Sequence, residues 1–376
     1  MKVAIATDSL VRPGGADELL KALLKAYPKA DIFTSVYNAN RYSYLKKNNV
    51  HTSFIQGLPF RKILYRHYTP LSPIAFEQFD FSGYDLVLSI SAGCAKGVIT
   101  GPQTFHLGII CTPPRYQWGG ISNTRASRSR SIIKSVTPVM DFYLRVWDLE
   151  ASKRPNELVS ISNFVSRKVK KVYRRESHVV HPGVDLSFWN EGVGTMPDGE
   201  RDENKYGTNF YLVVSRLYDY KRIDLAVEAC NRLNRRLIVV GEGPDAKYLK
   251  SLAGPNVTFL GYCSTQEKKS LMSRARAFLF PGVEDFGLTP VESMACGTPV
   301  IAYNKGGVAE TVIDKETGVF FDRQTVESLC DTIRDFETMD FDRKDLTGRA
   351  REFSENLFLE KIKNLVNEGI NKISEN

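Results

Sequence analysis

Short apolar runs alternate with helix-like segments along the first 190 residues. Residues 2–7 (KVAIAT) are an apolar run that predicts a buried strand. A glycine-containing loop follows, and residues 16–26 then place leucines at helical spacing. Further strand-like runs lie at residues 32–36, 86–89 and 107–110, with weaker ones at 156–161 and 177–181, and residues 164–173 resemble a helix. This alternation predicts βαβ units and a parallel sheet covered on both faces.

The same pattern restarts in the second half. Residues 190–209 are poor in apolar residues and rich in Gly, Asp and Glu, which indicates a connection between domains. Strand-like runs then lie at 210–214, 236–240, 257–260, 277–280 and 299–302, and residues 224–233 predict a helix. Residues 352–373 are amphipathic and predict one long helix. We therefore expect two α/β domains, over residues 1–190 and 205–352, and a helix over 353–376.

Composition places the chain among ordinary globular enzymes. It is 42% hydrophobic and 25% charged, which is not typical of disordered, collagen-like or coiled-coil sequences. It has no apolar run of transmembrane length, and its apolar N-terminal run is too short for a signal peptide. The six cysteines are widely spaced and form no CxxC pair, so we expect free thiols in a reducing cytoplasm, without a metal site.

Charge is divided unevenly between the two halves. Residues 1–190 contain 26 Lys and Arg against 13 Asp and Glu, whereas the remainder contains 25 against 30. The net charges of +13 and −5 indicate that the first half faces an anionic partner. Nucleic acid and an anionic membrane are the two candidates at this point.

Residues 278–301 (FLFPGVEDFGLTPVESMACGTPVI) contain the most informative group of polar positions. Glu284 and Glu292 are separated by seven residues, and Phe286, Gly287 and Leu288 lie between them. Backbone N–H groups at a helix start suit an anion, and a carboxylate suits the vicinal hydroxyls of a sugar or ribose. An isolated pair of this spacing is more often two solvated glutamates on a surface loop, but the flanking residues favour a binding site.

A second group lies in residues 211–226 (YLVVSRLYDYKRIDLA). Arg216 and Lys221 follow a predicted strand and are five positions apart. Two cations at the carboxyl end of a strand suit a diphosphate, with Arg as a forked donor and Lys as a point charge. Taken alone, they would more often be a solvated pair of surface charges.

With these segments together, residues 210–320 resemble the retaining glycosyltransferases of the large GT-B-fold family, glycosyl transferases group 1. The resemblance rests on S-R-L-x(3)-K, G-E-G-P, P-x(2)-E-D-F-G-L-x-P-x-E-x(3)-C-G-T-P-V-I, G-G-V-x-E-T-V and T-G, in that order. It implies two Rossmann-like domains facing each other across a cleft, with a C-terminal helix that crosses back to the first domain.

The first half resembles the same family, especially its bacterial O-antigen and capsule mannosyltransferases. Gly14 and Gly15 match the family's N-terminal glycine loop. Residues 112–118 (TPPRYQW) resemble the family segment H-T-P-x-R-Y-x-W, which makes Cys111, Arg115, Tyr116 and Trp118 acceptor-side candidates. Cys111 stands where the family has His, and a thiol is a weaker hydrogen-bonding group than imidazole. His106, on the preceding strand, is expected to be structural.

The resemblance implies transfer of a hexose from a nucleotide diphosphate sugar with retention at the anomeric carbon and without a metal or cofactor. Arg216, Lys221 and Glu284 are the implied catalytic residues, with the two cations carrying the charge of the leaving group. Glu284 would hold the donor sugar and Glu292 the ribose, and the N–H groups of Phe286, Gly287 and Leu288 would help to fix the sugar. Gly14 and Gly15 would let backbone N–H groups approach the phosphates.

The acceptor is expected to be a glycan or a lipid-linked sugar in cell-surface polysaccharide synthesis, lipopolysaccharide included. Residues 116–134 contain four basic residues and no acidic one: Arg125, Arg128, Arg130 and Lys134. They are candidates for contact with anionic lipid, so we expect a cytoplasmic protein held peripherally at the cytoplasmic face of the membrane, although a solvated loop remains the alternative.

GDP-mannose is the first choice of donor, and a UDP-hexose or a rhamnose donor is the alternative. A GT-B epimerase or phosphorylase is a second class, but no segment matches the pyridoxal-binding Lys of a phosphorylase. A non-catalytic sugar- or nucleic-acid-binding relative is a third, favoured by the basic half and the missing His. The four donor residues argue against it, and we expect no nucleic-acid partner.

Overall fold

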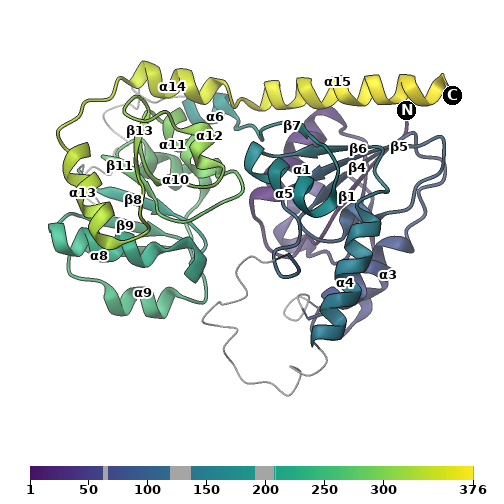
Figure 1. Ribbon diagram of the computed structural model, residues 1–376, viewed down its shortest axis with the longest axis horizontal. Coiled ribbons are helices and arrows are strands. Elements are labelled where there is room, and N and C mark those ends of the chain that lie inside the picture. The colour runs from purple at the N-terminus through teal and green to yellow at the C-terminus, as the bar shows by residue number, and fades with distance from the viewer. Residues whose placement is uncertain (62–66, 119–136, 191–206, 208, 376) are drawn as a thin grey trace. The chain divides into compact units, whose positions relative to one another are not determined.

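The computed structural model describes residues 1–61, 67–118, 137–190, 207 and 209–375, which divide into two compact units, each with its own parallel sheet (Figure 1). Unit 1 contains the described residues from Met1 to Pro182 and those from Asn356 onward, and unit 2 contains those from Gly183 to Glu355. Two Rossmann-like α/β units are what the sequence predicts.

The sheet of unit 1 has seven strands in the order β3-β2-β1-β4-β5-β6-β7. The strands are β1 Val3–Thr7, β2 Asp31–Thr34, β3 Val50–Thr52, β4 Leu86–Ser91, β5 Phe105–Ile110, β6 Glu157–Ser160 and β7 His178–Val179. The helices are α1 Gly15–Ala26, α3 Ser72–Glu77, α4 Thr137–Ala151, α5 Asn163–Tyr173 and α15 Glu355–Ser374, and a short 3-10 turn, η5, spans Ala95–Gly97. The sequence pattern predicts α1, α5, α15 and six of these strands but does not predict β3 or α4.

The sheet of unit 2 has six strands in the order β10-β9-β8-β11-β12-β13. They are β8 Tyr211–Val214, β9 Leu237–Val240, β10 Val257–Gly261, β11 Ala277–Phe280, β12 Val300–Tyr303 and β13 Gly318–Phe321. The helices are α6 Leu186–Asn190, α8 Ile223–Leu233, α9 Ala246–Leu252, α10 Thr265–Met272, α11 Leu288–Ala295, α12 Val308–Thr311, α13 Val326–Phe336 and α14 Arg343–Arg351, with the 3-10 turn η8 at Asp219–Lys221.

Both sheets reverse their strand order at one point, between β1 and β4 in unit 1 and between β8 and β11 in unit 2. Ile5 pairs with Leu88 across the first reversal, and Leu212 pairs with Phe278 across the second. In open parallel sheets, ligands bind beyond the carboxyl ends of the strands at this switch point. In unit 2, the residues that follow β8 and β11 lie at this position.

The boundary between the units differs from the one expected from sequence. The sequence pattern ends the first domain at residue 190, but the contacts place Gly183–Asn190 with unit 2. The reason is packing of α6: Trp189 is 5% exposed, and its carbonyl accepts from the Cys296 thiol after α11. Apolar residues of α6 are thus covered by the second sheet's helices.

The C-terminal helix belongs to unit 1. Its buried residues are Phe358, Ile362, Val366 and Gly369, which lie on one face. Gly369 packs where any Cβ would strike the ring of Phe105 on β5, and Lys372 Nζ lies 2.9 Å from Glu157 Oε1 on β6. The chain therefore returns to complete the unit in which it began.

Candidate functional site

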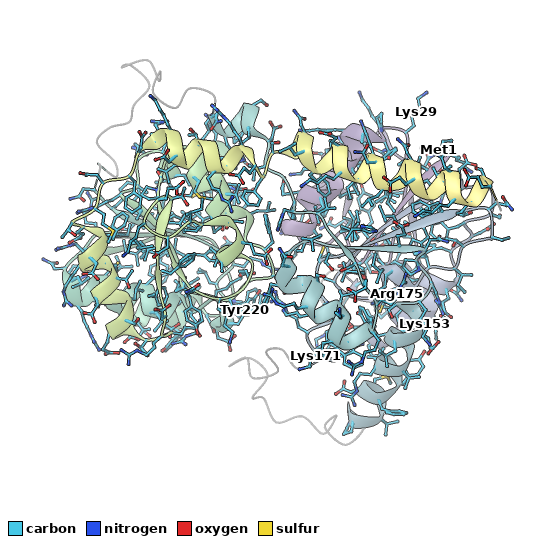
Figure 2. All side chains as sticks on the ribbon, turned by 45° about the horizontal axis from the view of Figure 1, so that its top comes forward. Met1, Lys29, Lys153, Lys171, Arg175 and Tyr220 are labelled. Atoms are coloured by element: carbon cyan, nitrogen blue, oxygen red, sulfur yellow. The ribbon has the colours of Figure 1, made fainter. Side chains whose placement is uncertain are left out.

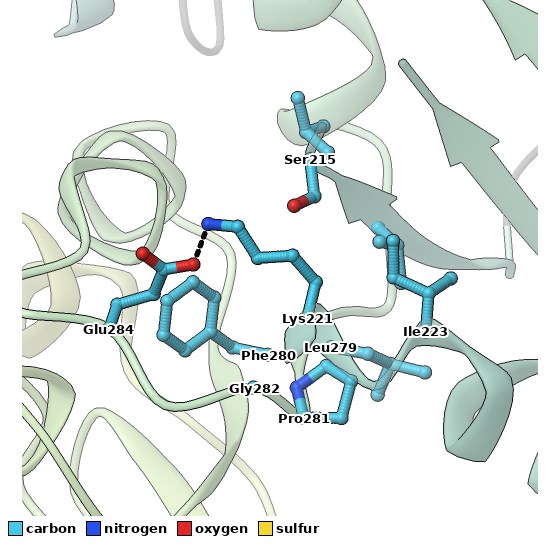
Figure 3. A pocket seen from close by; sticks show the side chains of 10 residues that line it. Ser215, Lys221, Ile223, Leu279, Phe280, Pro281, Gly282 and Glu284 are labelled. Carbon is cyan, nitrogen blue, oxygen red and sulfur yellow. Dashed lines mark ion pairs between the residues drawn. The ribbon is translucent and has the colours of Figure 1, made fainter. Parts of the chain in front are cut away.

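Lys221 and Glu284 meet at the switch point of unit 2. Lys221 ends η8, the turn that follows β8, and Glu284 lies in the loop after β11. Their side chains form an ion pair, and each is 14% exposed. Figure 3 shows the Lys221 ammonium group pointing at the Glu284 carboxylate, above the ring of Phe280, and these residues line a small pocket with Ser215. Two residues that the sequence predicts for one site are thus brought together.

Glycines allow the loops around this pair to approach each other closely. A Cβ on Gly282 would lie 2.8 Å from the carbonyl oxygen of Lys221, closer than real Cβ contacts. Gly306 has φ +95 and packs against the backbone of Glu284, whose carbonyl accepts from the Gly307 N–H at 2.9 Å. The glycines of the G-G-V motif therefore hold the Glu284 loop in place, which is a structural reason for their position in the sequence.

Glu292 lies on α11 and is 7% exposed. Its Oε2 lies 2.9 Å from the Nζ of Lys268 on α10, and this ammonium group also lies 4.6 Å from the centroid of the Trp189 ring. Sequence reasoning did not select Lys268 or Trp189, because no motif contains them. The predicted ribose-binding carboxylate is thus held by a partner from another helix.

Phe286, Gly287 and Leu288 form the entry to α11. Gly287 is the N-cap with φ +92, a conformation that favours glycine. Phe286 is 3% exposed, and its ring centroid lies 5.9 Å from that of Phe353. The Phe286 side chain is therefore a packing group, and only backbone N–H groups of this segment are suited to a ligand.

The side chain of Arg216 is more exposed than those of Lys221 and Glu284. Its side chain is exposed, with the guanidinium 5.7 Å from the Tyr218 ring centroid and Nη2 3.5 Å from the Tyr220 hydroxyl. It lies in the loop between β8 and η8, as the sequence predicts, and the two tyrosines hold it there.

The glycine loop of unit 1 lies at the start of α1, with Gly14 as the N-cap and Gly15 as the first helical residue. The Gly14 N–H donates to the carboxylate of Asp17, which is 7% exposed. Burial raises the pKa of Asp17 to about 6, although the Gly14 N–H acts in the opposite direction. This N–H is therefore already engaged within the protein, a feature that the glycine pattern alone does not reveal.

The acceptor-side candidates follow β5. Cys111 and Arg115 are half-buried, and Tyr116 is 46% exposed. Trp118 is half-buried, and its Nε1 donates to Asp148 Oδ2 at 2.7 Å. Gln117 is 5% exposed, and neither polar atom of its amide has a hydrogen-bond partner among the protein groups of this structure. The tryptophan is thus anchored by a hydrogen bond to α4.

Asp148 belongs to a buried charged cluster that sequence reasoning missed. Its carboxylate also forms an ion pair with Lys96 in η5, and both side chains are 1% exposed. Lys96 Nζ additionally donates to the Gly93 carbonyl at 2.8 Å and lies 5.4 Å from the centroid of the Tyr173 ring. The cluster joins the loop after β4, helix α4 and the segment after β5.

Asp8 occupies the switch point of unit 1. It follows β1, and its carboxylate accepts from the N–H groups of Ala92 at 2.7 Å and Ala95 at 2.9 Å, after β4. Burial raises the pKa of Asp8 despite these hydrogen bonds. The aspartate therefore ties together the loops on either side of the strand reversal.

His106 is a buried structural residue, as expected. It is fully buried on β5, with Nε2 2.8 Å from the Ser89 hydroxyl on β4. Burial lowers its pKa to about 3, so the ring is neutral.

Arg125, Arg128, Arg130 and Lys134 lie outside the described residues. All six cysteines are free, and four of them are buried. Within the described ranges, no three His, Cys, Asp or Glu side chains come together in a way that could hold a metal ion. None of the described helices has both the length and the apolar character needed to cross a bilayer.

Sequence comparison identifies the second half of the chain. Residues 198–353 match the family model described as glycosyl transferases group 1. A Mycobacterium tuberculosis GDP-mannose-dependent alpha-(1-6)-phosphatidylinositol monomannoside mannosyltransferase is 29% identical over 63% of this chain and 66% of its own length. The D-rhamnosyltransferase WbpZ of Pseudomonas aeruginosa is 27% identical over 51% of this chain and 50% of its own length. The chain thus spans about half to two thirds of the length of these curated relatives.

Solved structures match over nearly the whole chain. Anabaena HepE in complex with UDP has a TM-score of 0.72 at 18% identity, covering 98% of this chain and all of HepE. A sucrose-phosphate synthase from Thermosynechococcus elongatus has a TM-score of 0.72 at 19% identity, covering 98% of this chain and 99% of its own. At such identities the likeness establishes the fold. The chain thus matches glycosyl transferases group 1 over residues 198–353, and its fold is the GT-B fold of two Rossmann-like domains.

Proposed function

We propose that this protein transfers a hexosyl group from a nucleotide diphosphate sugar to a hydroxyl of a glycan or lipid-linked acceptor. The observation that carries the proposal is the Lys221–Glu284 pair at the switch point of the sheet in unit 2. A cation and an acceptor-only carboxylate side by side match a ligand that presents a phosphate next to sugar hydroxyls. Such a ligand replaces the internal ion pair with two complementary contacts.

Each residue has a proposed role in this reaction. Lys221 and Arg216 stabilise the negative charge that develops on the leaving diphosphate. Glu284 accepts hydrogen bonds from the hydroxyls of the donor sugar, and the N–H groups at the start of α11 assist it. Glu292, held by Lys268, accepts from the ribose hydroxyls. Since the Gly14 N–H already donates to Asp17, we propose that the Gly15 N–H makes the phosphate contact in unit 1.

GDP-mannose is the proposed donor, with a UDP-hexose or a rhamnose donor as the alternative. Similarity to a GDP-mannose-dependent mannosyltransferase supports the first, and similarity to UDP-bound HepE and to a D-rhamnosyltransferase supports the second. The proposed reaction retains the anomeric configuration and uses neither a metal ion nor an organic cofactor. NMR of the first-formed product anomer tests retention, and activity that is equal with and without EDTA tests metal independence.

The proposed setting is synthesis of a cell-surface polysaccharide at the cytoplasmic face of a membrane. The net charge of +13 in residues 1–190 supports an anionic partner for the first half. The acceptor candidates Cys111, Arg115, Tyr116 and Trp118 follow β5 in unit 1 and are proposed to contact the acceptor.

The experiment is a thermal-shift screen of GDP, UDP and dTDP followed by turnover of the matching nucleotide sugar. Bound nucleotide raises the Tm by mass action. We expect Glu284→Ala to reduce turnover at least about tenfold, or about 1.4 kcal/mol of transition-state stabilisation, and to leave the fold intact because the residue lies on a loop.

The matched control is Glu327→Ala. It also breaks a Glu ion pair, with Arg232 Nη1 at 2.7 Å, but both side chains are more than half exposed. Such pairs contribute little, so this variant should behave as wild type. Wild-type turnover in folded Glu284→Ala would reject the assigned site. Nucleotide binding without any turnover would instead favour the non-catalytic relative.

A further inference from the structure

Helix α4 presents an apolar stripe outward. Val139, Phe142, Tyr143 and Val146 are 70%, 64%, 42% and 46% exposed, and they follow the i, i+3, i+4, i+7 spacing of one helical face. The surface helices of a globular protein usually present polar residues outward. Exposed apolar stripes of this kind mark interaction sites.

The opposite face of α4 is already used. Leu144 and Ala151 are buried, and Asp148 is paired with Lys96 inside unit 1. The helix therefore cannot rotate its stripe inward without breaking a buried ion pair. Its outward direction is fixed by the fold.

A basic helix neighbours α4. Residues 163–175, which contain α5, include six Lys and Arg and no acidic residue. Arg167, Lys170, Lys171 and Arg174 are exposed, while Val165, Val169 and Tyr173 are buried. The cations thus share the outward face of α5, and Lys170 pairs with Glu176 at 2.6 Å.

Hydrogen bonds join the segments that follow the two helices. Arg175 lies two residues after the end of α5 and donates from Nη1 to the carbonyls of Ser152 at 2.7 Å and Pro155 at 2.9 Å, in the segment between α4 and β6. Figure 2 shows Lys171 and Lys153 near these ends of the two helices. The segments that follow α4 and α5 are therefore tied together, and unit 1 carries the apolar stripe on one of these helices and the basic face on the other.

We propose that the apolar stripe of α4 and the basic face of α5 form a docking surface for an anionic lipid bilayer. The cations attract the negative headgroups, and the four apolar side chains enter the boundary between headgroups and acyl chains. A nucleic acid could pair its phosphates with the cations, but its charged backbone would not bury the exposed valine and phenylalanine side chains. This surface is distinct from residues 125–134, and its test does not depend on glycosyl transfer.

The test is co-sedimentation of the full chain with phosphatidylcholine vesicles, with and without phosphatidylglycerol. Wild type should bind the anionic vesicles, with a salt-sensitive part from α5 and a salt-resistant part from α4. We expect Phe142→Ser with Val146→Ser to weaken binding about tenfold or more, and to abolish the salt-resistant part. Arg167→Gln with Lys171→Gln should weaken binding about tenfold or more at low salt, because two cations that attract the anionic headgroups are lost.

Two control variants match these changes in chemistry. Phe54→Ser with Ile99→Ser removes exposed apolar side chains elsewhere in unit 1, where they are 42% and 51% exposed. Lys247→Gln with Lys250→Gln removes two exposed cations from α9 in unit 2. Both controls should bind vesicles as wild type does. Thermal unfolding of each variant verifies that the fold is intact.

Three outcomes would overturn the proposal. The first is equal vesicle binding by wild type and the α4 variant. The second is a wild-type dimer that the α4 variant dissociates, which would assign the stripe to a second copy of the chain. The third is salt-sensitive binding to a duplex oligonucleotide without vesicle binding.

Discussion

At the scale of single residues, burial and pairing decide what each polar group can do. Glu284 and Lys221 remain partly accessible, so a ligand can compete for them. His106 is fully buried beside Ser89 and is removed from such chemistry. The difference is one of environment, because the side chains alone would allow either role.

His106 gives a pH prediction. Its folded pKa of about 3 lies below its ordinary value, so below about pH 6.5 the unfolded chain binds the proton more readily. This contribution to stability is fully present above pH 6.5 and is lost as pH falls toward 3, by up to about 1.4 kcal/mol per pH unit. His106→Gln can still donate to Ser89 but does not titrate, so its urea-unfolding free energy should fall less steeply between about pH 7 and pH 4.5.

The control for this prediction is His67→Gln, which replaces an exposed histidine. It should leave the pH dependence as in wild type. Identical slopes for His106→Gln and wild type would contradict a neutral buried imidazole.

At the scale of elements, α4 holds together segments that follow two different strands. Asp148 on this helix bonds to Lys96 after β4 and to Trp118 after β5. Asp148→Asn should therefore lower the free energy of unfolding by about 3–5 kcal/mol, since it leaves the Lys96 charge buried without a partner. Urea unfolding measures the loss.

A milder variant separates the two contacts of Asp148. Trp118→Phe removes the indole N–H and reduces the ring from nine atoms to six, but it leaves the Asp148 charge in place, so it should cost about 1.5–3 kcal/mol and preserve the Lys96 pair. If the proposed acceptor role of residues 111–118 holds, this variant should raise the acceptor KM and leave the nucleotide Kd unchanged. A smaller stability loss in Asp148→Asn than in Trp118→Phe would contradict this order.

Two glycines give a matched test of how α15 packs. Gly369→Ala on α15 should lower the free energy of unfolding by about 1–3 kcal/mol, because its Cβ meets the buried Phe105 ring. Gly348→Ala on α14 meets nothing within 4 Å and should stabilise the protein by up to about 1 kcal/mol through helix propensity. Thermal unfolding that shifts both variants in the same direction would argue against close packing of α15 on β5.

At the scale of the whole molecule, the chain forms two units, and its C-terminal helix α15 belongs to the first of them. Phe358, Ile362 and Val366 of α15 are at most 1% exposed and belong to unit 1. A chain ending at Ser354 loses three buried side chains, each contributing about 1.5–3 kcal/mol, a total comparable with the stability of a domain. We expect unit 1 to unfold and unit 2 to keep a thermal transition, which added nucleotide should raise if the proposed donor site lies in unit 2.

Calorimetry with and without nucleotide distinguishes the two transitions. A full-length protein in which Gly348 is replaced by alanine is the control, since it keeps every α15 contact. Retention of an unchanged unit 1 transition in the shortened chain would show that α15 is dispensable there.

The sequence alone determined the α/β class, the restart of the pattern near residue 210 and the segments that bear Lys221, Glu284 and Glu292. These features are local, because hydrophobic periodicity and sequence motifs depend only on residues close together in the chain. Strand β3 was not predicted, because a segment of three residues carries little periodic signal. The extent of α14 and the break before α15 were also not predicted from periodicity.

Only the tertiary structure decided which of these residues meet. Strand order placed the loops after β8 and β11 side by side, and so joined Lys221 to Glu284. Packing of α6 moved the unit boundary from residue 190 to Pro182. The buried Asp148 side chain fixed which face of α4 points outward. The physical reason is that pairing and burial depend on contacts between distant segments, whereas periodicity reports only that a helix has an apolar face and not what covers it.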